Sequence, residues 1–347
     1  MKNVLTIILT ILLTYSQSAF SQTLTANADL RAIFEERHGY GSLFYDSLKA
    51  GNYISQRTRI NINYQNNKLK LKLAPQNVRV WGDVTTTSKN DSSTSMHEAW
   101  AEYQLNSRIY IKVGRQELNY DDARILGNVD WTMAARSHDL ALLKIRPDTT
   151  SFLHLGLAIN ASKEISITEN YLQLGQYKYA HLLWYHKDLK NLGISLLVLN
   201  QGFPFLDSTN VKIAWNQTSG GRFNWKKKSL NLELSTYIQT GEIAKNTVSA
   251  WYAQGNCSYT FKNHYQVLVG AELLSGKSIN DKSTKIKSFN PWYGTNHKFN
   301  GFMDYFYVNN HKNSVGLIDL FLSLTYQKNK LKIILTPHYF MSAATLY

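Results

Sequence analysis

Arginine and carboxylate side chains dominate the residue types that could do chemistry between Arg57 and Arg136. A guanidinium group donates two parallel hydrogen bonds to a carboxylate, so such arginines suit an anionic solute. We expect the arginines to contact that solute and the acids to act as counter-charges that shape a constriction. The candidate solute-binding set is Arg57, Arg59, Arg79, Arg115, Glu117, Asp121, Asp122, Arg124, Asp130 and Arg136.

A second interpretation of these charges needs no solute. The arginines could pair with nearby acids and only stiffen the wall of the fold. The available partners are Glu98, Glu102, Glu117, Asp121, Asp122 and Asp130. The sequence leaves both interpretations open, and both can hold in one protein.

Metal and catalytic motifs are weak in this chain. Asp121 and Asp122 could bind a divalent cation with Asp130, but no calcium-loop spacing supports this, and salt bridges to Arg124 or Arg115 are the preferred interpretation. His97-Glu98 resembles the start of a zinc-protease motif, yet Ala101 stands where the second histidine must be. His138-Asp139 could belong to a hydrolase triad, but the chain has no GxSxG motif. We expect no metal, no cofactor and no enzyme.

The elements that must position these residues are strands with alternating polarity. In Gln56–Tyr64, Ile60 and Ile62 fall on one face while Arg57 and Arg59 fall on the other. Leu69–Trp81 alternates in the same way but changes parity at Pro75. A β-bulge at Pro75-Gln76 would explain the change and would place Arg79 on the polar face. We count about fifteen such runs, each of about ten residues, which is the length of a tilted membrane strand.

The connectors alternate in length. Short ones fall at Asn66-Asn67, Asn106-Ser107, Lys187–Asn191 and Lys328-Asn329, and long ones begin at Asn119 or cover Gln201–Asn210 and Gly276–His311. Short turns on one side and long loops on the other are typical of an outer-membrane β-barrel. The sequence therefore predicts an all-β, transmembrane, antiparallel up-and-down barrel whose polar faces line a lumen.

The N-terminus predicts export. Lys2 precedes a ten-residue apolar run, Val4–Leu13, and small residues lead to a cleavage site after Ser21. We expect residues 1–21 to be a signal peptide and residues 22–347 to form one barrel domain in the outer membrane, in contact with its lipid. The single cysteine, Cys257, excludes an internal disulfide, and no later run of eighteen apolar residues predicts a membrane helix.

The chain is basic, with a net charge of +14 that falls to +13 when Lys2 leaves with the signal peptide. A basic surplus raises the local concentration of anions. Acidic polymers or small anions are the expected partners. Nucleic acid is not expected, because export and the absence of any common nucleic-acid motif argue against it.

Three blocks of the sequence, QNVRVWGD (Gln76–Asp83), Val113–Trp131 and Ala135–Lys144, resemble the alginate-export family of outer-membrane barrels. A long-loop region, Phe289–Phe306, fits the same family. The resemblance covers nearly all the chain after residue 21. It implies an 18-stranded barrel with a narrow, electropositive lumen, and the family's founding member secretes the polyuronate alginate. We count about fifteen strands in the sequence, and the resemblance raises the expected number to 16–18. Because Ser342–Thr345 is a weak strand, we expect that closing C-terminal strands are missing from this chain.

The resulting prediction is a passive channel for an alginate-like anionic polysaccharide or smaller anions, served by periplasmic export partners. The alternative is a barrel-embedded hydrolase or a non-conducting polysaccharide-binding surface protein. A continuous basic passage would favour the channel, and a plugged, apolar or Ser/His-lined interior would favour the alternative.

Overall fold

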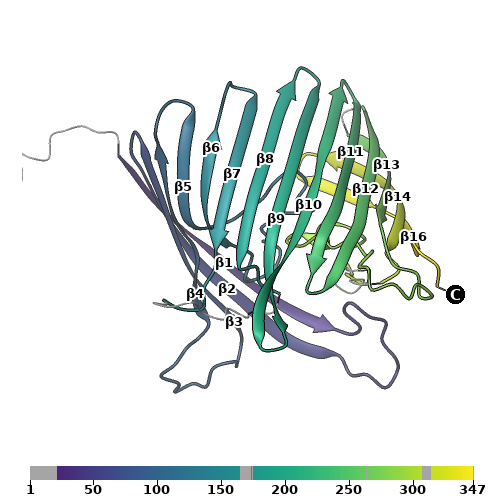
Figure 1. Ribbon diagram of the computed structural model, residues 1–347, viewed down its shortest axis with the longest axis horizontal. Coiled ribbons are helices and arrows are strands. Elements are labelled where there is room, and N and C mark those ends of the chain that lie inside the picture. Colours follow the sequence, from purple (N-terminus) through teal and green to yellow (C-terminus); the bar gives the residue numbers. More distant parts are fainter. Residues whose placement is uncertain (1–21, 165–172, 174, 263, 307–313, 347) are drawn as a thin grey trace, which may run out of the picture.

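The computed structural model describes residues 22–164, 173, 175–262, 264–306 and 314–346, and the predicted signal peptide lies outside them. These residues form one antiparallel sheet of sixteen strands, which curves around the loops that it encloses (Figure 1). The strands are β1 (Thr23–Arg37), β2 (Gly51–Gln65), β3 (Leu69–Val80), β4 (Thr94–Gln104), β5 (Ile109–Gln116), β6 (His138–Ile145), β7 (Ser151–Ile159), β8 (Tyr179–Leu189), β9 (Leu192–Asp207), β10 (Asn210–Lys227), β11 (Leu230–Ile243), β12 (Asn246–Phe261), β13 (Tyr265–Leu274), β14 (Leu317–Lys328), β15 (Leu331–Leu335) and β16 (His338–Met341).

Each strand pairs with the next one in the chain from β1 to β15, and β16 pairs with β14. The predicted up-and-down antiparallel order and the strand number are therefore confirmed. In the described residues β1 pairs with β2 alone, and β15 and β16 each pair with β14 alone. Closure of the barrel between these two edges stays a prediction.

Alternation along the strands separates an apolar outer face from a polar inner face. On β2, Ile60 and Ile62 are exposed, while Arg57 and Arg59 are buried on the opposite side. On β1 the outward side chains Leu30 and Phe34 are 71% and 65% exposed. Large apolar side chains that face outward around the whole sheet are what contact with lipid requires. We call the inner, polar side the lumen. No helix in the described ranges is long and apolar enough to cross a membrane.

The turns differ between the two rims of the sheet. Seven connections at one rim are short, at residues 66–68, 105–108, 146–150, 190–191, 228–229, 262–264 and 329–330. The other rim carries the long connections 38–50, 81–93, 117–137, 160–178 and 275–316, together with the two-residue turns 208–209 and 244–245. The long loop predicted at Gln201–Asn210 is wrong, because β9 and β10 extend through it and pair continuously from Asn210↔Asp207 to Trp225↔Leu192.

Two of the long loops fold into the lumen and form much of the core. In loop 117–137, Ile125 and Leu126 are almost completely buried, and in loop 275–316 Phe289 is buried. The loops join through a parallel bridge between Leu126 and Tyr293. The apolar side chains of these loops pack against inward residues of β6, β9, β11 and β12, so the described lumen is partly filled.

The predicted bulge at Pro75-Gln76 is wrong in its location. The β2–β3 register runs without a shift from Gln65↔Lys70 to Ser55↔Val80, so β3 keeps its parity. The irregularity lies between β3 and β4, where Ala74 pairs with Glu98 but Pro75 pairs with Met96. The extra residue is therefore His97 on β4, and this bulge turns both His97 and Glu98 into the interior.

Gly114 on β5 allows this part of the wall to close. Its φ is +120°, and a Cβ there would lie 2.2 Å from the carbonyl oxygen of Ala99 on β4. We expect Gly114→Ala to destabilise the refolded barrel by about 3 kcal/mol, because it adds both backbone strain and a clash with a backbone atom. The urea midpoint measures this. Gly51→Ala is the control, since a Cβ there meets nothing within 4 Å; equal midpoints for the two variants would contradict the prediction.

Candidate solute pathway in the lumen

Three arginines of the first two strands converge on one carboxylate of loop 117–137. Arg57 Nη1 donates to Asp130 Oδ1 at 2.8 Å, Arg59 Nη1 lies 3.5 Å from the same oxygen, and Arg31 Nη2 lies 3.4 Å from Oδ2. Arg57 is only 1% exposed and also pairs with Asp29 on β1. We call Arg31, Arg57, Arg59 and Asp130 the arginine cluster. Three guanidinium groups for two carboxylates leave it with an excess positive charge.

The arginine cluster is fixed from behind by neutral groups. Gln76 on β3 accepts two hydrogen bonds from Arg59 at its Oε1, at 3.0 and 2.7 Å. The Gln76 amide in turn donates to the carbonyl of Ala134 in loop 117–137. Asp130 is the more accessible partner, with 43% of its side chain exposed. The arginines are therefore held by the wall while their counter-ion sits on a loop.

Burial acts to raise the pKa of Asp130, but the hydrogen bond from Arg57 and the charges of Arg57, Arg31 and Arg59 hold it below the ordinary value of 3.8. A carboxyl with a lowered folded-state pKa stabilises the fold fully above its unfolded pKa and loses that contribution as the pH falls through the folded pKa. We expect Asp130→Asn to lower the urea midpoint near neutral pH, and the difference from wild type to shrink as the pH falls below about 4. A difference in urea midpoint between Asp130→Asn and wild type that does not change with pH would contradict this prediction.

Loop 117–137 is anchored at the far wall by a buried ion pair. Arg124, which is fully buried, places Nη2 3.0 Å from Glu272 Oε1 on β13. The rings of Phe299 and Tyr252 lie 4.3 and 5.2 Å from its guanidinium carbon. Since Asp130 touches β2 and Arg124 touches β13, this loop crosses the lumen.

Acids surround a cavity of about 570 Å³ between the loop and the β10–β14 wall. Its ionisable lining residues are Asp121, Asp122, Arg222, Glu233, Glu272, Lys298, Asp319 and His338. Arg222 lies 2.9 Å from Glu233 and 3.7 Å from Asp122. The pKa of Asp121 is raised because burial and the neighbouring Asp122 disfavour its charge, against hydrogen bonds from Ser195 and Trp184. Positive charge therefore prevails at the arginine cluster and negative charge at this cavity.

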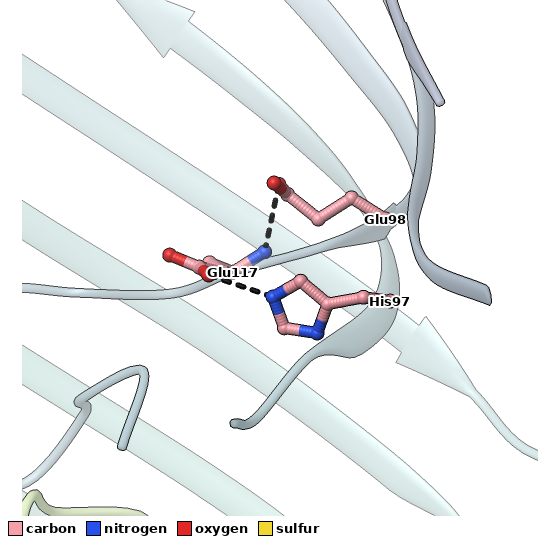
Figure 2. Close-up of side chains that lie close together, drawn as sticks. All are labelled: His97, Glu98 and Glu117. Carbon is pink, nitrogen blue, oxygen red and sulfur yellow. Dashed lines mark hydrogen bonds and ion pairs between the residues drawn. The ribbon is translucent and has the colours of Figure 1, made fainter. Parts of the chain in front are cut away.

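His97, Glu98 and Glu117 come together in the lumen and could in principle hold a metal ion (Figure 2). Glu117 Oε1 lies 2.7 Å from His97 Nε2, and its backbone N–H faces Glu98. Each carboxylate already has other partners: Lys72 pairs with Glu98, and Asn128 donates to Glu117 at 2.9 Å. The hydrogen bonds of this group are complete without an ion, so we assign it a structural role.

Lysines and glutamates alternate on the inner faces of β3 to β6. Lys72 pairs with Glu98, and Lys144 lies 2.6 Å from Glu102. Lys112 lies 3.9 Å above the Trp100 ring. The sequence predicted that Lys70 and Lys72 lie on the polar face. In the structure they stand opposite Glu102 and Trp100 of β4, which agrees with that prediction.

Two predicted solute contacts lie outside the lumen. Arg79 pairs with Gln56 in register, on the face of Leu71 and Leu73, and bonds Asp91 of loop 81–93. Arg115 stands opposite Ala99, on the face of Val113, and pairs with Asp139 at 2.7 Å. The prediction that Arg79 faces the lumen is wrong, because the bulge that would turn it inward is on β4 and not on β3. Arg115 lies two positions after the outward Val113 on the same strand, which places it on the outer face.

The other predicted residues have varied positions. Arg136 donates to the carbonyl of Gly294 at 3.2 Å and so ties loop 117–137 to loop 275–316. Asp121 accepts from Trp184 at 3.2 Å. The predicted pairing of these acids with Arg124 or Arg115 is wrong, because Asp122 faces Arg222 and Asp130 faces the arginine cluster.

Several luminal charges were not predicted from the sequence. Arg31 was detectable, since it alternates with Leu30 and Ala32 on β1. Arg222 follows Gly220 and Gly221, which carry no side chain to reveal a face. Glu272 and Asp319 lie in mostly apolar strands, and only their distant partners mark them as important.

The fold and the charged lumen define a porin-like outer-membrane β-barrel. The sequence matches the family model described as alginate export over residues 44–340, so the chain belongs to the alginate export family. This confirms the resemblance, the fold class and the outer-membrane location. A search of the curated proteins found no significant match.

Solved structures support the fold. OpdL of Pseudomonas aeruginosa aligns with a TM-score of 0.56 at 13% identity, covering 87% of this chain and 76% of its own. OccK9 (OpdG) of the same organism aligns with a TM-score of 0.53 at 11% identity, covering 88% of this chain and 78% of its own. Salmonella typhi OmpF, solved in complex with daunomycin, aligns with a TM-score of 0.51 at 11% identity, covering 92% of this chain and 90% of its own.

Proposed function

We propose that this barrel passes anionic solutes, foremost an alginate-like polyuronate, past the arginine cluster. The observation that carries the proposal is the convergence of Arg31, Arg57 and Arg59 on the single carboxylate of Asp130. Asp130 occupies the place that a carboxylate of the solute would take. An incoming uronate would displace it, because a guanidinium binds either carboxylate with the same fork geometry.

Exchange between an internal and an external carboxylate keeps the solute mobile. A pore needs sites that bind strongly enough to admit an ion and weakly enough to release it. When a uronate leaves, Asp130 returns to the arginines, so these are never left without a counter-ion. Transport of this kind is passive, and the proposal needs neither a cofactor nor a metal.

The hydrolase alternative gains no support from His138 and Asp139. His138 faces the interior and lies 3.1 Å from the Tyr177 hydroxyl, while Asp139 faces outward and pairs with Arg115. Consecutive strand residues point to opposite faces, so these two cannot form a catalytic dyad. Their positions therefore remove this support for a hydrolase.

The proposal is tested by block of ion current through the refolded barrel in a planar bilayer. We expect an oligouronate to block the current reversibly and a neutral dextran of equal length to block it far less. An Arg57→Gln/Arg59→Gln variant should lose the difference between the two polymers. Equal block by both polymers in the wild type, or no conductance, would contradict the proposal.

A further inference from the structure

The short-turn rim of the barrel carries positive charge at every turn. Each of the seven short turns contains one exposed lysine or arginine: Lys68, Arg108, Arg146, Lys190, Lys228, Lys262 and Lys330. The one acid within these turns is Asp148, whose ion pair is with Lys187. No ion pair joins the seven cations to a carboxylate in the part of the chain that the structure describes.

The opposite rim is mixed in charge. Its long loops combine exposed lysines such as Lys89 with acids such as Asp83 and Asp91, and Lys287 pairs with Asp281 at 2.7 Å. Within the lumen, most described arginines face an acid. The basic surplus of this chain is therefore concentrated at the short-turn rim, where further lysines flank the turns at Lys226, Lys227, Lys328 and Lys332.

A polar cavity of about 530 Å³ opens just inside this rim, at the β10–β13 wall. Lys226 and Lys228 line it together with the amides and hydroxyls of Asn231, Ser258, Thr260 and Gln266. Amides and hydroxyls suit the hydroxyl groups of a sugar, and lysines suit its carboxylate. The one acid in the lining, Glu233, is already paired with Arg222 at 2.9 Å.

We propose that the exposed cations of the short-turn rim and the polar cavity inside it form a loading site that captures an anionic polysaccharide. In outer-membrane barrels the short turns face the periplasm. This inference rests on the proposed function and adds the end at which the solute is captured. A ring of exposed cations around a low-dielectric mouth raises the local concentration and the association rate of a polyanion. The ring then feeds the arginine cluster deeper in the lumen.

The test compares oligouronate block from the two sides of one planar bilayer. The insertion direction is set by labelling Asn90→Cys, in a Cys257→Ser background, with an impermeant thiol reagent. At low salt we expect the association rate of block to be at least about tenfold higher from the short-turn side. Salt should reduce the difference, because a surface potential is screened within about 10 Å at 0.1 M.

Variants assign the effect to the rim. Lys226→Gln/Lys227→Gln/Lys228→Gln should lower the association rate of block from the short-turn side severalfold at low salt. The charge-matched control is Lys89→Gln/Lys282→Gln/Lys285→Gln on the long loops, which should leave that rate unchanged. Substitutions at exposed positions of this kind rarely alter the stability of the fold.

Three outcomes would overturn the inference in distinguishable ways. Equal block from both sides refutes the loading site and leaves the proposed function intact. No block from either side refutes the proposed function as well. Unchanged block by the triple variant, with weakened binding to phosphatidylglycerol but not phosphatidylcholine vesicles, means that the rim contacts lipid headgroups instead.

Discussion

Arg57→Gln is expected to lower the anion-over-cation permeability ratio about fivefold. The substitution removes one positive charge from the arginine cluster and leaves Asp29 and Asp130 without their shared partner. At about 4 Å and high effective dielectric, one unit charge contributes about 1 kcal/mol to a passing ion, which corresponds to that ratio. The reversal potential across a salt gradient measures it.

Two further variants test whether the change in the permeability ratio depends on the charge of the side chain and on its position in the lumen. Arg57→Lys keeps the charge and should keep most of the selectivity, although an ammonium cannot bridge two carboxylates with a fork. Arg115→Gln removes the same charge from the outer face and should leave the ratio unchanged. If Arg115→Gln lowered the ratio as much as Arg57→Gln does, the assignment of the two faces would be wrong.

Replacing Glu272 with leucine is expected to destabilise the barrel by about 3–5 kcal/mol, because it leaves the Arg124 guanidinium buried without a carboxylate. The Tyr252 hydroxyl, which donates to Glu272 at 2.8 Å, and Asn300 Nδ2, which donates to it at 2.6 Å, would lose an acceptor as well. The urea midpoint in lipid vesicles is the measurement.

The double variant Arg124→Leu/Glu272→Leu is the matched control. Removing both charges should recover much of the lost stability, since a buried ion pair contributes little beyond the cost of desolvating it. Glu272→Gln preserves the shape of the side chain, so its urea midpoint should lie between those of the wild type and Glu272→Leu. A double variant less stable than Glu272→Leu would contradict the account of this anchor.

Strands with strict alternation could be predicted from the sequence, and their faces with them. Gln56–Tyr64 sets Ile60 and Ile62 against Arg57 and Arg59, and the structure keeps that division. The short turns were also visible, because polar residues such as Asn66 and Asn106 interrupt apolar runs. Local sequence determines both features, since each depends on neighbours within one hairpin.

Features that depend on pairing between strands could not be predicted. A parity change near Pro75 suggested a bulge on β3, but the extra residue is on the partner strand, at His97. The partners of Asp130 lie about 70 to 100 positions away in the sequence, on β1 and β2. The two long loops meet at Leu126 and Tyr293 only because the sheet encloses both. No local pattern encodes such contacts.

The most direct test of the central claim is the reversal potential of the wild type and of Asp130→Asn across the same salt gradient. If Asp130 occupies arginines that otherwise hold the solute, the wild type should be anion-selective. Asp130→Asn should then be more anion-selective and bind oligouronate more tightly than Glu102→Gln, which removes a luminal acid elsewhere. A cation-selective wild type, or an Asp130→Asn barrel that binds oligouronate no better than Glu102→Gln, would contradict the account.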